Sequence, residues 1–281
     1  MRLSILLMLL VVLSSCSDDA PSHVGGALPD EPNIRVRVVR STESVRIDAD
    51  ASLLIQPIGS QRQFMSDQPV VFTIKSSIWA INGETLPDIG MATIEVRLAD
   101  GSPGAVIRAN GQAYPGFLHL VPRQSSDAVA RRFDVINHIH LEAYLPGVLE
   151  REIYSDWRLA TFHAQAIAAR SYALERLLNA SPSRTFDVES TQASQAYAGA
   201  TDNPNAIIGV LETTGLVLTH KNQVLPAYYS STCGGAGLSP DGAFANDQYL
   251  PPLEPIEHPP YCRDSRYFDW GPIRRNLVSL G

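Results

Sequence analysis

Short runs in which apolar and polar residues alternate fill the chain from Asn33 to about Leu141. The clearest are IRVRVV (34–39), SVRID (44–48), VVFTIK (70–75), ATIEVRL (92–98) and FDVINHIHL (133–141). Because alternation with a period of two puts apolar side chains on one face of an extended chain, each run predicts a β-strand. Dipeptides typical of tight turns lie between the runs, at Asn82-Gly83, Asp100-Gly101 and Asn110-Gly111. This part of the chain is therefore predicted to be rich in β-structure.

A helical period appears further along, in residues 159–178 (LATFHAQAIAARSYALERLL). Apolar side chains recur there at steps of three and four residues, at Leu159, Phe162, Ala166, Ala169, Ala173 and Leu177. This spacing predicts one amphipathic helix with a buried stripe, and Asp156 is its expected N-cap.

A second helix and a hairpin are predicted after the first helix. Residues 204–214 begin with proline, follow Asn203 as a cap and precede Gly215 as a stop, which is the usual punctuation of a helix. Residues 215–231 (GLVLTHKNQVLPAYYSS) predict a hairpin that turns near Lys221-Asn222. Strands that are followed by helices and further strands indicate an α+β fold.

The N-terminus has the pattern of an export signal. Met1-Arg2 carries positive charge, and the apolar run 3–13 is too short to span a bilayer as a helix. The run ends in LSSC, which resembles the bacterial lipobox and predicts lipid attachment at Cys16. An ordinary secretory signal with a cysteine by chance is the alternative, and both readings export the protein. The residue after the cysteine is Ser17 and not Asp, which favours sorting of the lipoprotein to the outer membrane where the cell has one. Residues 17–32 are expected to be a flexible tether.

The charge balance narrows the classes of partner. Lys and Arg number 22 against 29 Asp and Glu, which gives a net charge of −7. An acidic chain lacks the basic surface with which proteins bind nucleic acid, and a polybasic contact with a membrane surface is equally disfavoured. Uncharged polymers such as glycans remain compatible with this charge.

The chain has three cysteines, Cys16, Cys233 and Cys262. Export would place the last two in an oxidising compartment, so a Cys233–Cys262 disulfide is one prediction. A metal site that uses His258 and Cys262 is the rival, although so few scattered ligands are a weak signal. The spacing alone leaves the choice open.

Arg170 is the most informative polar residue of the first predicted helix, because it lies on or beside the apolar stripe. A guanidinium in that position needs a carboxylate or carbonyl partner, since an unpaired buried charge is costly. Glu152, Glu142 and Glu150 are the candidates, and an arginine that reaches water at the rim is the alternative. Residues 144–157 (YLPGVLEREIYSDW) read as a polar loop–helix junction.

No other pattern indicates a familiar catalytic site. His138 and His140 alternate in a predicted strand, as the start of a metal site could, but no third ligand is evident and surface histidines are the preferred reading. The sequence has no nucleophile elbow, phosphate-binding glycine loop or zinc-protease helix.

Several ordered motifs resemble those of one known family. LEAYLPGVLEREI (141–153), Trp157 and HAQAIAARSYAL (163–174) are similar to the signature of the stage II sporulation protein D and amidase-enhancer family, SpoIID/LytB. Further matches follow in the same order, at QAY (195–197), Gly199, GLVL (215–218) and AYYSSTCGG (227–235). The resemblance covers nearly all of the chain after the tether.

The resemblance implies chemistry on the glycan strands of bacterial peptidoglycan. Some members are lytic transglycosylases that cut strands stripped of stem peptides, and others are described as enhancers of a cell-wall amidase. The family's catalytic glutamate corresponds to Glu152, which would need a raised pKa to act first as an acid and then as a base. A close Arg170 would lower that pKa, so Arg170 is expected to be offset from Glu152 and to orient the groove or bind the lactyl carboxylate of the substrate.

The resemblance also suggests which residues bind sugar. The expected substrate-binding residues are Arg170, Gln195, Tyr197, Tyr229 and Ser231. Some members carry a His-Cys pair that is associated with zinc, but Ala193 and Ser194 stand at those positions, so neither a metal nor another cofactor is expected. The Cys233-Gly234-Gly235 segment could be a tight turn that Cys262 locks.

Together these observations predict an exported lipoprotein of the cell envelope. Its parts are a signal peptide with the lipobox cysteine (1–16), a tether (17–32), a β-rich N-terminal part (33–132), a SpoIID/LytB-like core (133–270) and a C-terminal tail (271–281). Its expected partners are peptidoglycan glycan strands, the membrane through the lipid anchor, and a cell-wall amidase if it acts as an enhancer.

Overall fold

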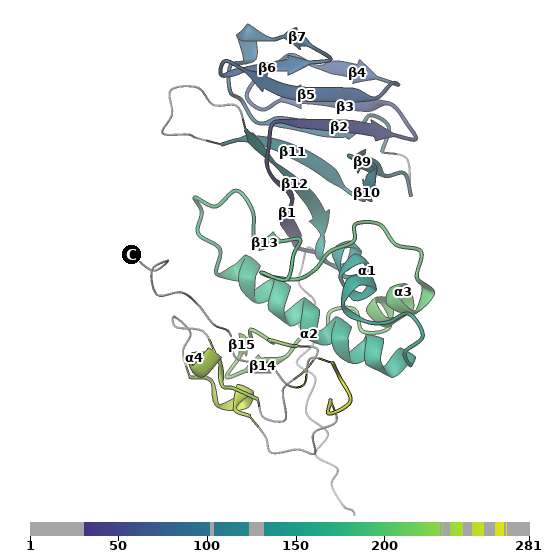
Figure 1. The fold of residues 1–281 in the computed structure, drawn as a ribbon, viewed down its shortest axis with the longest axis vertical. Helices are drawn as coiled ribbons and strands as arrows, with labels where there is room; N and C mark the ends of the chain where they lie inside the picture. The colour runs from purple at the N-terminus through teal and green to yellow at the C-terminus, as the bar shows by residue number, and fades with distance from the viewer. Residues whose placement is uncertain are drawn as a thin grey trace, which may run out of the picture.

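A computed structural model describes residues 31–101, 104–123, 132–230, 232, 237–243, 249–255, 262–266 and 268. Two β-sheets form one end of the molecule, and a group of helices lies against the other end of the longer strands (Figure 1). The predicted lipobox cysteine Cys16, most of the tether, Ser231, Cys233 and His258 lie outside the described residues.

One sheet has seven strands and the other has six. The first has the order β13 (Val188–Glu189), β1 (Asn33–Thr42), β12 (Phe133–His140), β11 (Phe117–Pro122), β8 (Ile94–Leu98), β3 (Leu53–Pro57) and β4 (Phe64–Ser66). The second has the order β10 (Gln112–Tyr114), β9 (Ile107–Ala109), β2 (Ser44–Ala49), β5 (Val70–Lys75), β6 (Ile78–Ile81) and β7 (Glu84–Thr85). Neighbouring strands are antiparallel, except that β13 runs parallel to β1.

Alternating apolar side chains of the two sheets meet in a common core. Ile34 and Val36 of β1 and Val45 and Ile47 of β2 are buried, whereas the residues between them are more exposed. The edge of the Trp79 ring meets Phe133 with ring centroids 4.9 Å apart, which joins β6 to β12. Face-to-face packing of this kind lets each sheet bury its apolar face against the other.

The five predicted strands are all present, and two of the predicted turn dipeptides have the backbone of a tight hairpin turn. Asn82 and Gly83 join β6 to β7 with φ of 50° and 88°, and Asn110 and Gly111 join β9 to β10 with φ of 51° and 85°. Positive φ at both central residues is the signature of a turn that matches the twist of the strands. The α+β fold is confirmed.

The helices are α1 (Leu141–Glu152), α2 (Leu159–Leu178), α3 (Pro204–Leu211) and the short α4 (Pro240–Ala243), with 3₁₀ turns η1 (Pro87–Ile89) and η2 (Pro251–Leu253). Helix α2 has the predicted bounds. Asp156 is not its N-cap, however, because Arg158 occupies that position and makes no side-chain capping bond. Asn203 caps α3 as predicted by accepting from the backbone of Asn205 and Ala206.

Helix α3 and the hairpin are both shorter than predicted. Helix α3 ends at Leu211, three residues before Thr214. The hairpin consists of β14 (Thr219–His220) and β15 (Gln223–Val224), and its turn residues Lys221 and Asn222 have φ of 50° and 63°.

Helix α1 corrects the interpretation of residues 144–157 as a loop–helix junction. Tyr144, Leu145, Val148 and Leu149 are buried and follow a helical period, so packing favours a helix there. Pro146 lies inside the helix, where it lacks the N–H that would close one turn. The apolar face of α1 outweighs that loss.

Strand β12 connects the two ends of the molecule. It pairs with both β1 and β11, and α1 begins directly after its last residue, His140. The expected boundary between residues 33–132 and 133–270 therefore passes through the seven-stranded sheet. This arrangement places the C-terminal end of α1, where Glu152 lies, beyond the end of the sheet (Figure 1).

The described helices include none that could cross a bilayer, since none is both long and apolar enough.

Candidate functional site

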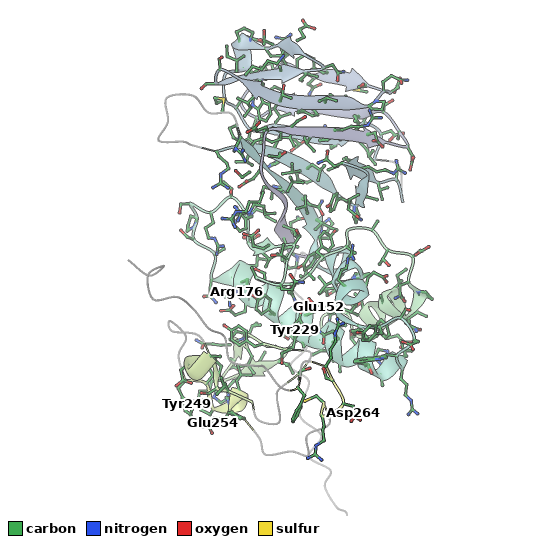
Figure 2. All side chains as sticks on the ribbon, in the orientation of Figure 1. Glu152, Arg176, Tyr229, Tyr249, Glu254 and Asp264 are labelled. Atoms are coloured by element: carbon green, nitrogen blue, oxygen red, sulfur yellow. The ribbon has the colours of Figure 1, made fainter. Side chains whose placement is uncertain are left out.

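Glu152 is the last residue of α1, and its side chain is half-buried. The carboxylate Oε1 accepts a hydrogen bond from the backbone N–H of Ala196 at 2.9 Å, and the Tyr229 hydroxyl is a second hydrogen-bond partner. Figure 2 shows Glu152 and Tyr229 next to each other at the middle of α2. Glu152 forms no ion pair within the described part of the chain, so its carboxyl group is held by neutral donors alone.

Burial raises the pKa of the Glu152 carboxyl, because removal from water disfavours the charged form. The hydrogen bonds from Ala196 and Tyr229 oppose this effect, since they favour the carboxylate, but burial is the larger cause. Tyr229 itself remains a protonated phenol, because burial and the nearby Glu152 charge both raise its pKa. A carboxyl with a raised pKa beside a hydroxyl donor is suited to give a proton and then to accept one.

Gln195 positions the donors around Glu152. Its side chain is 0% exposed, and its amide nitrogen donates to the Ala169 carbonyl at 3.2 Å and to the Tyr229 hydroxyl at 3.1 Å. The Tyr144 hydroxyl donates to the Gln195 carbonyl oxygen at 3.2 Å. Gln195 thus joins α1, α2 and Tyr229 in one buried network that fixes the position of the next residue, Ala196.

The Tyr197 side chain joins the segment 195–199 to the seven-stranded sheet. Its buried hydroxyl donates to Oδ1 of Asn137, a buried residue of β12, at 3.1 Å. Gly147 of α1 allows this close approach, because a Cβ there would lie 2.7 Å from the Tyr197 ring and still closer to the Gly199 carbonyl oxygen. The Gly147 carbonyl also accepts from Ala198 N–H at 2.9 Å. Residues 195–199 are therefore held against α1 along their length.

Arg170 is paired with Glu142 and not with Glu152. Its side chain is buried, and its Nε and Nη2 donate to the two carboxylate oxygens of Glu142 at 2.8 Å each. A further bond from Nη1 reaches the Leu216 carbonyl at 3.0 Å. This fork geometry joins α1, α2 and the segment after α3. The expectation that Arg170 is offset from Glu152 agrees with this pairing.

The family comparison matches the segment that contains this network. The SpoIID model, described as stage II sporulation protein, matches residues 129–220, about a third of the chain. Residues 129–220 therefore carry a SpoIID domain, in agreement with the resemblance of the sequence motifs. The matched residues include α1 with Glu152, α2 with Arg170, and the segment of Gln195 and Tyr197.

Two curated relatives are similar to parts of this chain. An uncharacterized protein of Brachyspira hyodysenteriae is 31% identical over 136 residues, which are 48% of this chain and 35% of that protein. An amidase enhancer of Bacillus subtilis is 25% identical over 218 residues, which are 78% of this chain and 28% of that protein. The matches thus span about a third of the length of these relatives.

Three of the predicted substrate-binding residues are buried in the SpoIID domain. Arg170, Gln195 and Tyr197 are at most 7% exposed, and their polar groups are bonded to other parts of the protein. Their geometry supports the site from within and favours no direct contact with sugar. Tyr229 is different, because it reaches both Glu152 and a cavity. Ser231 lies outside the described residues, so its role stays a prediction.

A cavity of about 360 Å³ adjoins Tyr229. Its walls are the segment 192–194 and the side chains of Tyr172, Arg176, Arg184, Asp187, Tyr228 and Tyr229. No sequence pattern selects Arg176, because an arginine in the last turn of a helix is usually a solvated residue. The cavity wall also contains Ala193 and Ser194, which stand where zinc-associated members of the family carry a His-Cys pair.

Two exposed aromatic side chains follow Glu152 in the chain. Tyr154 and Trp157 are 73% and 48% exposed, and their ring centroids are 5.7 Å apart. Exposed aromatic faces suit the apolar faces of sugar rings. Trp157 belongs to the motif that carries the family resemblance, and its exposure is consistent with a surface role.

The described residues contain no group of three side chains that could hold a metal ion. His138 contacts His119 of β11, with ring centroids 3.9 Å apart, and not His140. Burial, together with the charges of His119 and Arg35, lowers the pKa of His138 to about 3, so this imidazole stays neutral. His138 is partly exposed and packs against Phe117 and His119 of β11, and His140 is exposed, which agrees with the preferred surface reading.

Proposed function

We propose that this chain is a lytic transglycosylase of the cell envelope that cleaves the glycan strands of peptidoglycan. The observation that carries the proposal is the environment of Glu152, a half-buried carboxyl with a raised pKa that two neutral donors hold in place. Most glycosidases use two carboxyl groups, one on each side of the scissile bond. A reaction in which the 6-hydroxyl of the sugar takes the place of the second carboxyl group needs only Glu152.

The proposed reaction begins with protonated Glu152. The carboxyl donates its proton to the glycosidic oxygen as the bond between that oxygen and C1 breaks, and an oxocarbenium-like centre develops. The 6-hydroxyl of the same sugar then attacks C1, and its proton passes to the Glu152 carboxylate. The products are a free hydroxyl on one fragment and an anhydro ring on the other, and the carboxyl returns to its starting state without the entry of water.

The neighbouring residues have separate roles in this scheme. The Ala196 N–H and the Tyr229 hydroxyl stabilise the carboxylate formed after the first proton transfer, because both donate to it. Gln195 holds Tyr229 at 3.1 Å and so is a positioning residue. Tyr154 and Trp157 offer a surface on which a sugar ring of the strand can stack.

Enhancement of a cell-wall amidase is the second candidate function. The Bacillus subtilis relative, which aligns with 78% of this chain, is named an amidase enhancer. An enhancer needs to bind glycan or the amidase but has no need of an acid with a raised pKa. The raised pKa of Glu152 therefore favours the enzymatic function, and the name of the Bacillus subtilis relative favours the enhancer function.

One pair of digests separates the two functions. The full chain is incubated with glycan strands stripped of stem peptides, and the products are identified by mass spectrometry. Release of fragments with anhydromuramyl ends supports the enzyme. If no fragment is released, yet the chain accelerates a purified cell-wall amidase on intact peptidoglycan, the enhancer function replaces the enzymatic function.

Tyr229→Phe is expected to move the alkaline limb of the pH profile to higher pH. Because Glu152 must be protonated to start the reaction, kcat/KM falls as the pH rises through its pKa. The Tyr229 hydroxyl lowers that pKa, so its removal raises the pKa and shifts the limb upward. The exposed Tyr249 provides the matched control Tyr249→Phe, which should leave the profile unchanged. A limb that moves to lower pH in Tyr229→Phe would contradict the assignment.

We further propose that the chain is exported and lipid-anchored through Cys16, as the LSSC pattern at the end of the apolar run predicts. Cys16→Ser is expected to move the protein from the membrane fraction to the soluble fraction of the exporting cell, and to abolish incorporation of labelled fatty acid. Labelling that persists in this variant would exclude Cys16 as the attachment site.

A further inference from the structure

We infer that the cavity beside Tyr229 is a carboxylate-binding subsite, in which Arg176 recognises the free lactyl carboxylate of a peptide-stripped muramic acid. The inference rests on the proposed glycan substrate and extends it, because it names the group that distinguishes stripped from intact strands. Glycan strands are otherwise uncharged, and a stem peptide converts the lactyl carboxylate into an amide.

Arg176 has donor capacity that the protein does not use. Its Nε is buried and has no hydrogen-bond partner. Glu175 forms an ion pair with this nitrogen at 3.7 Å, which is too far for a hydrogen bond, and the Oε2 of Glu175 is likewise buried without a hydrogen-bond partner. Nη2 donates to the Tyr228 hydroxyl at 3.0 Å, and the guanidinium lies over the rings of Tyr172 and Tyr228. A buried unsatisfied donor is costly unless a ligand completes it.

The charge in the cavity wall suits an anion. Arg176 and Arg184 both line the cavity, and Asp187 is the one carboxylate in its wall. Asp187 is already neutralised, since its Oδ1 pairs with Arg35 at 2.6 Å and its Oδ2 accepts from the Arg35 backbone at 2.8 Å. Glu175, the other nearby acid, does not line this cavity. An incoming carboxylate would therefore meet two arginines and one paired aspartate.

The position of the cavity relates it to the proposed chemistry. Tyr229 lines the cavity and is also a hydrogen-bond partner of Glu152, so one side chain borders both. Figure 2 shows Arg176 nearer the C-terminal end of α2 than Glu152 and Tyr229. A volume of about 360 Å³ accommodates a group of the size of a sugar ring with its lactyl substituent. A glycan strand bound there would carry its carboxylate to Arg176 and the neighbouring linkage to Glu152.

The test measures binding, so that it does not depend on turnover. The Glu152→Gln chain is titrated with stripped glycan oligosaccharides and with the same oligosaccharides after their carboxylates have been converted to methylamides. The free carboxylate form should bind about tenfold more tightly, as a hydrogen bond to a charged group allows. In a Glu152→Gln chain that also carries Arg176→Met, the preference for the free carboxylate form should disappear, and the affinity for the methylamide form should stay unchanged.

Two further variants keep the result interpretable. Arg184→Gln should reduce the preference without disturbing the core, since Arg184 is exposed. Arg46→Gln removes the same charge from β2 and should leave the preference intact. If Arg176→Met loses affinity equally for both forms, or if the preference persists in it, the subsite is refuted. If the preference depends on Arg176 but the wild-type chain releases no anhydro product, the subsite stands and the enzymatic function fails.

Discussion

Glu152→Gln is expected to lower the rate of glycan cleavage by about 10²–10⁴-fold, the usual contribution of a positioned acid–base group. Glutamine keeps the size of the side chain, and its carbonyl oxygen can still accept from Ala196 N–H. It cannot donate a proton to the glycosidic oxygen or accept one from the 6-hydroxyl. Initial rates of fragment release from stripped glycan, followed by mass spectrometry, measure the effect.

The matched control for this prediction is Glu150→Gln. Glu150 is an exposed carboxylate of the same helix, and it accepts from Thr201 and from Asn203 at 2.8 Å. The control variant should retain nearly the wild-type rate. Denaturant titrations of both variants separate a loss of chemistry from a loss of fold. Full activity in Glu152→Gln would mean that another group supplies the proton.

Arg170→Met is expected to lower the free energy of unfolding by about 3 kcal/mol, the lower end of the range for breaking a buried ion pair. Glu142 would lose both hydrogen bonds of the fork, and the Leu216 carbonyl would lose a donor. Because Arg170 joins α1, α2 and the segment after α3, its loss should loosen all three together. Urea titration followed by circular dichroism measures the change.

A double-mutant cycle with Glu142→Gln distinguishes pairing from simple packing. If the two side chains act through each other, the double variant should be less destabilised than the sum of the single variants. The control is Arg62→Met, because the exposed pair of Arg62 is expected to contribute little to stability. Arg35→Met is not a suitable control, because Arg35 also pairs with a buried acid. A loss below about 1 kcal/mol in Arg170→Met would show that the pair carries little of the stability of the domain.

The elements that the sequence predicted well are those in which local pattern and packing agree. The period of α2 and the alternation of β1, β2, β5, β8 and β12 follow from side chains that face one core. Helix α1 was missed because Pro146 and the acidic residues around Glu150 suggest a junction, whereas burial of Tyr144 and Leu149 decides for a helix. Tertiary packing outweighed local preference there.

The partner of Arg170 shows a second limit of the sequence. The need for a carboxylate followed from burial on the stripe, but three glutamates of one segment were candidates. Only the helical geometry of α1 decides among them, because it places Glu142 against Arg170 and points Glu152 towards Ala196. A sequence without that helix offers no way to choose.

The substrate-binding predictions for Gln195 and Tyr197 meet a related limit. A motif shows that Gln195 and Tyr197 matter, but it does not show whether they touch substrate or hold the residues that do. Their hydrogen bonds to Tyr229 and Asn137 assign them the second role. Arg176 lies outside the strongest motif positions and became a candidate only through its unpaired donor and the cavity. The Cys233–Cys262 disulfide stays a prediction, because Cys233 lies outside the described residues.

Cleavage of stripped glycan in water enriched in heavy oxygen tests the central proposal most directly. If Glu152 accepts the proton of the sugar's own 6-hydroxyl as that oxygen attacks C1, the new ends are anhydro sugars, lighter by one water than hydrolysed ends and free of the heavy isotope. New reducing ends that carry the isotope would instead show that water attacks the sugar, and a reaction closed by Glu152 alone would have to be abandoned.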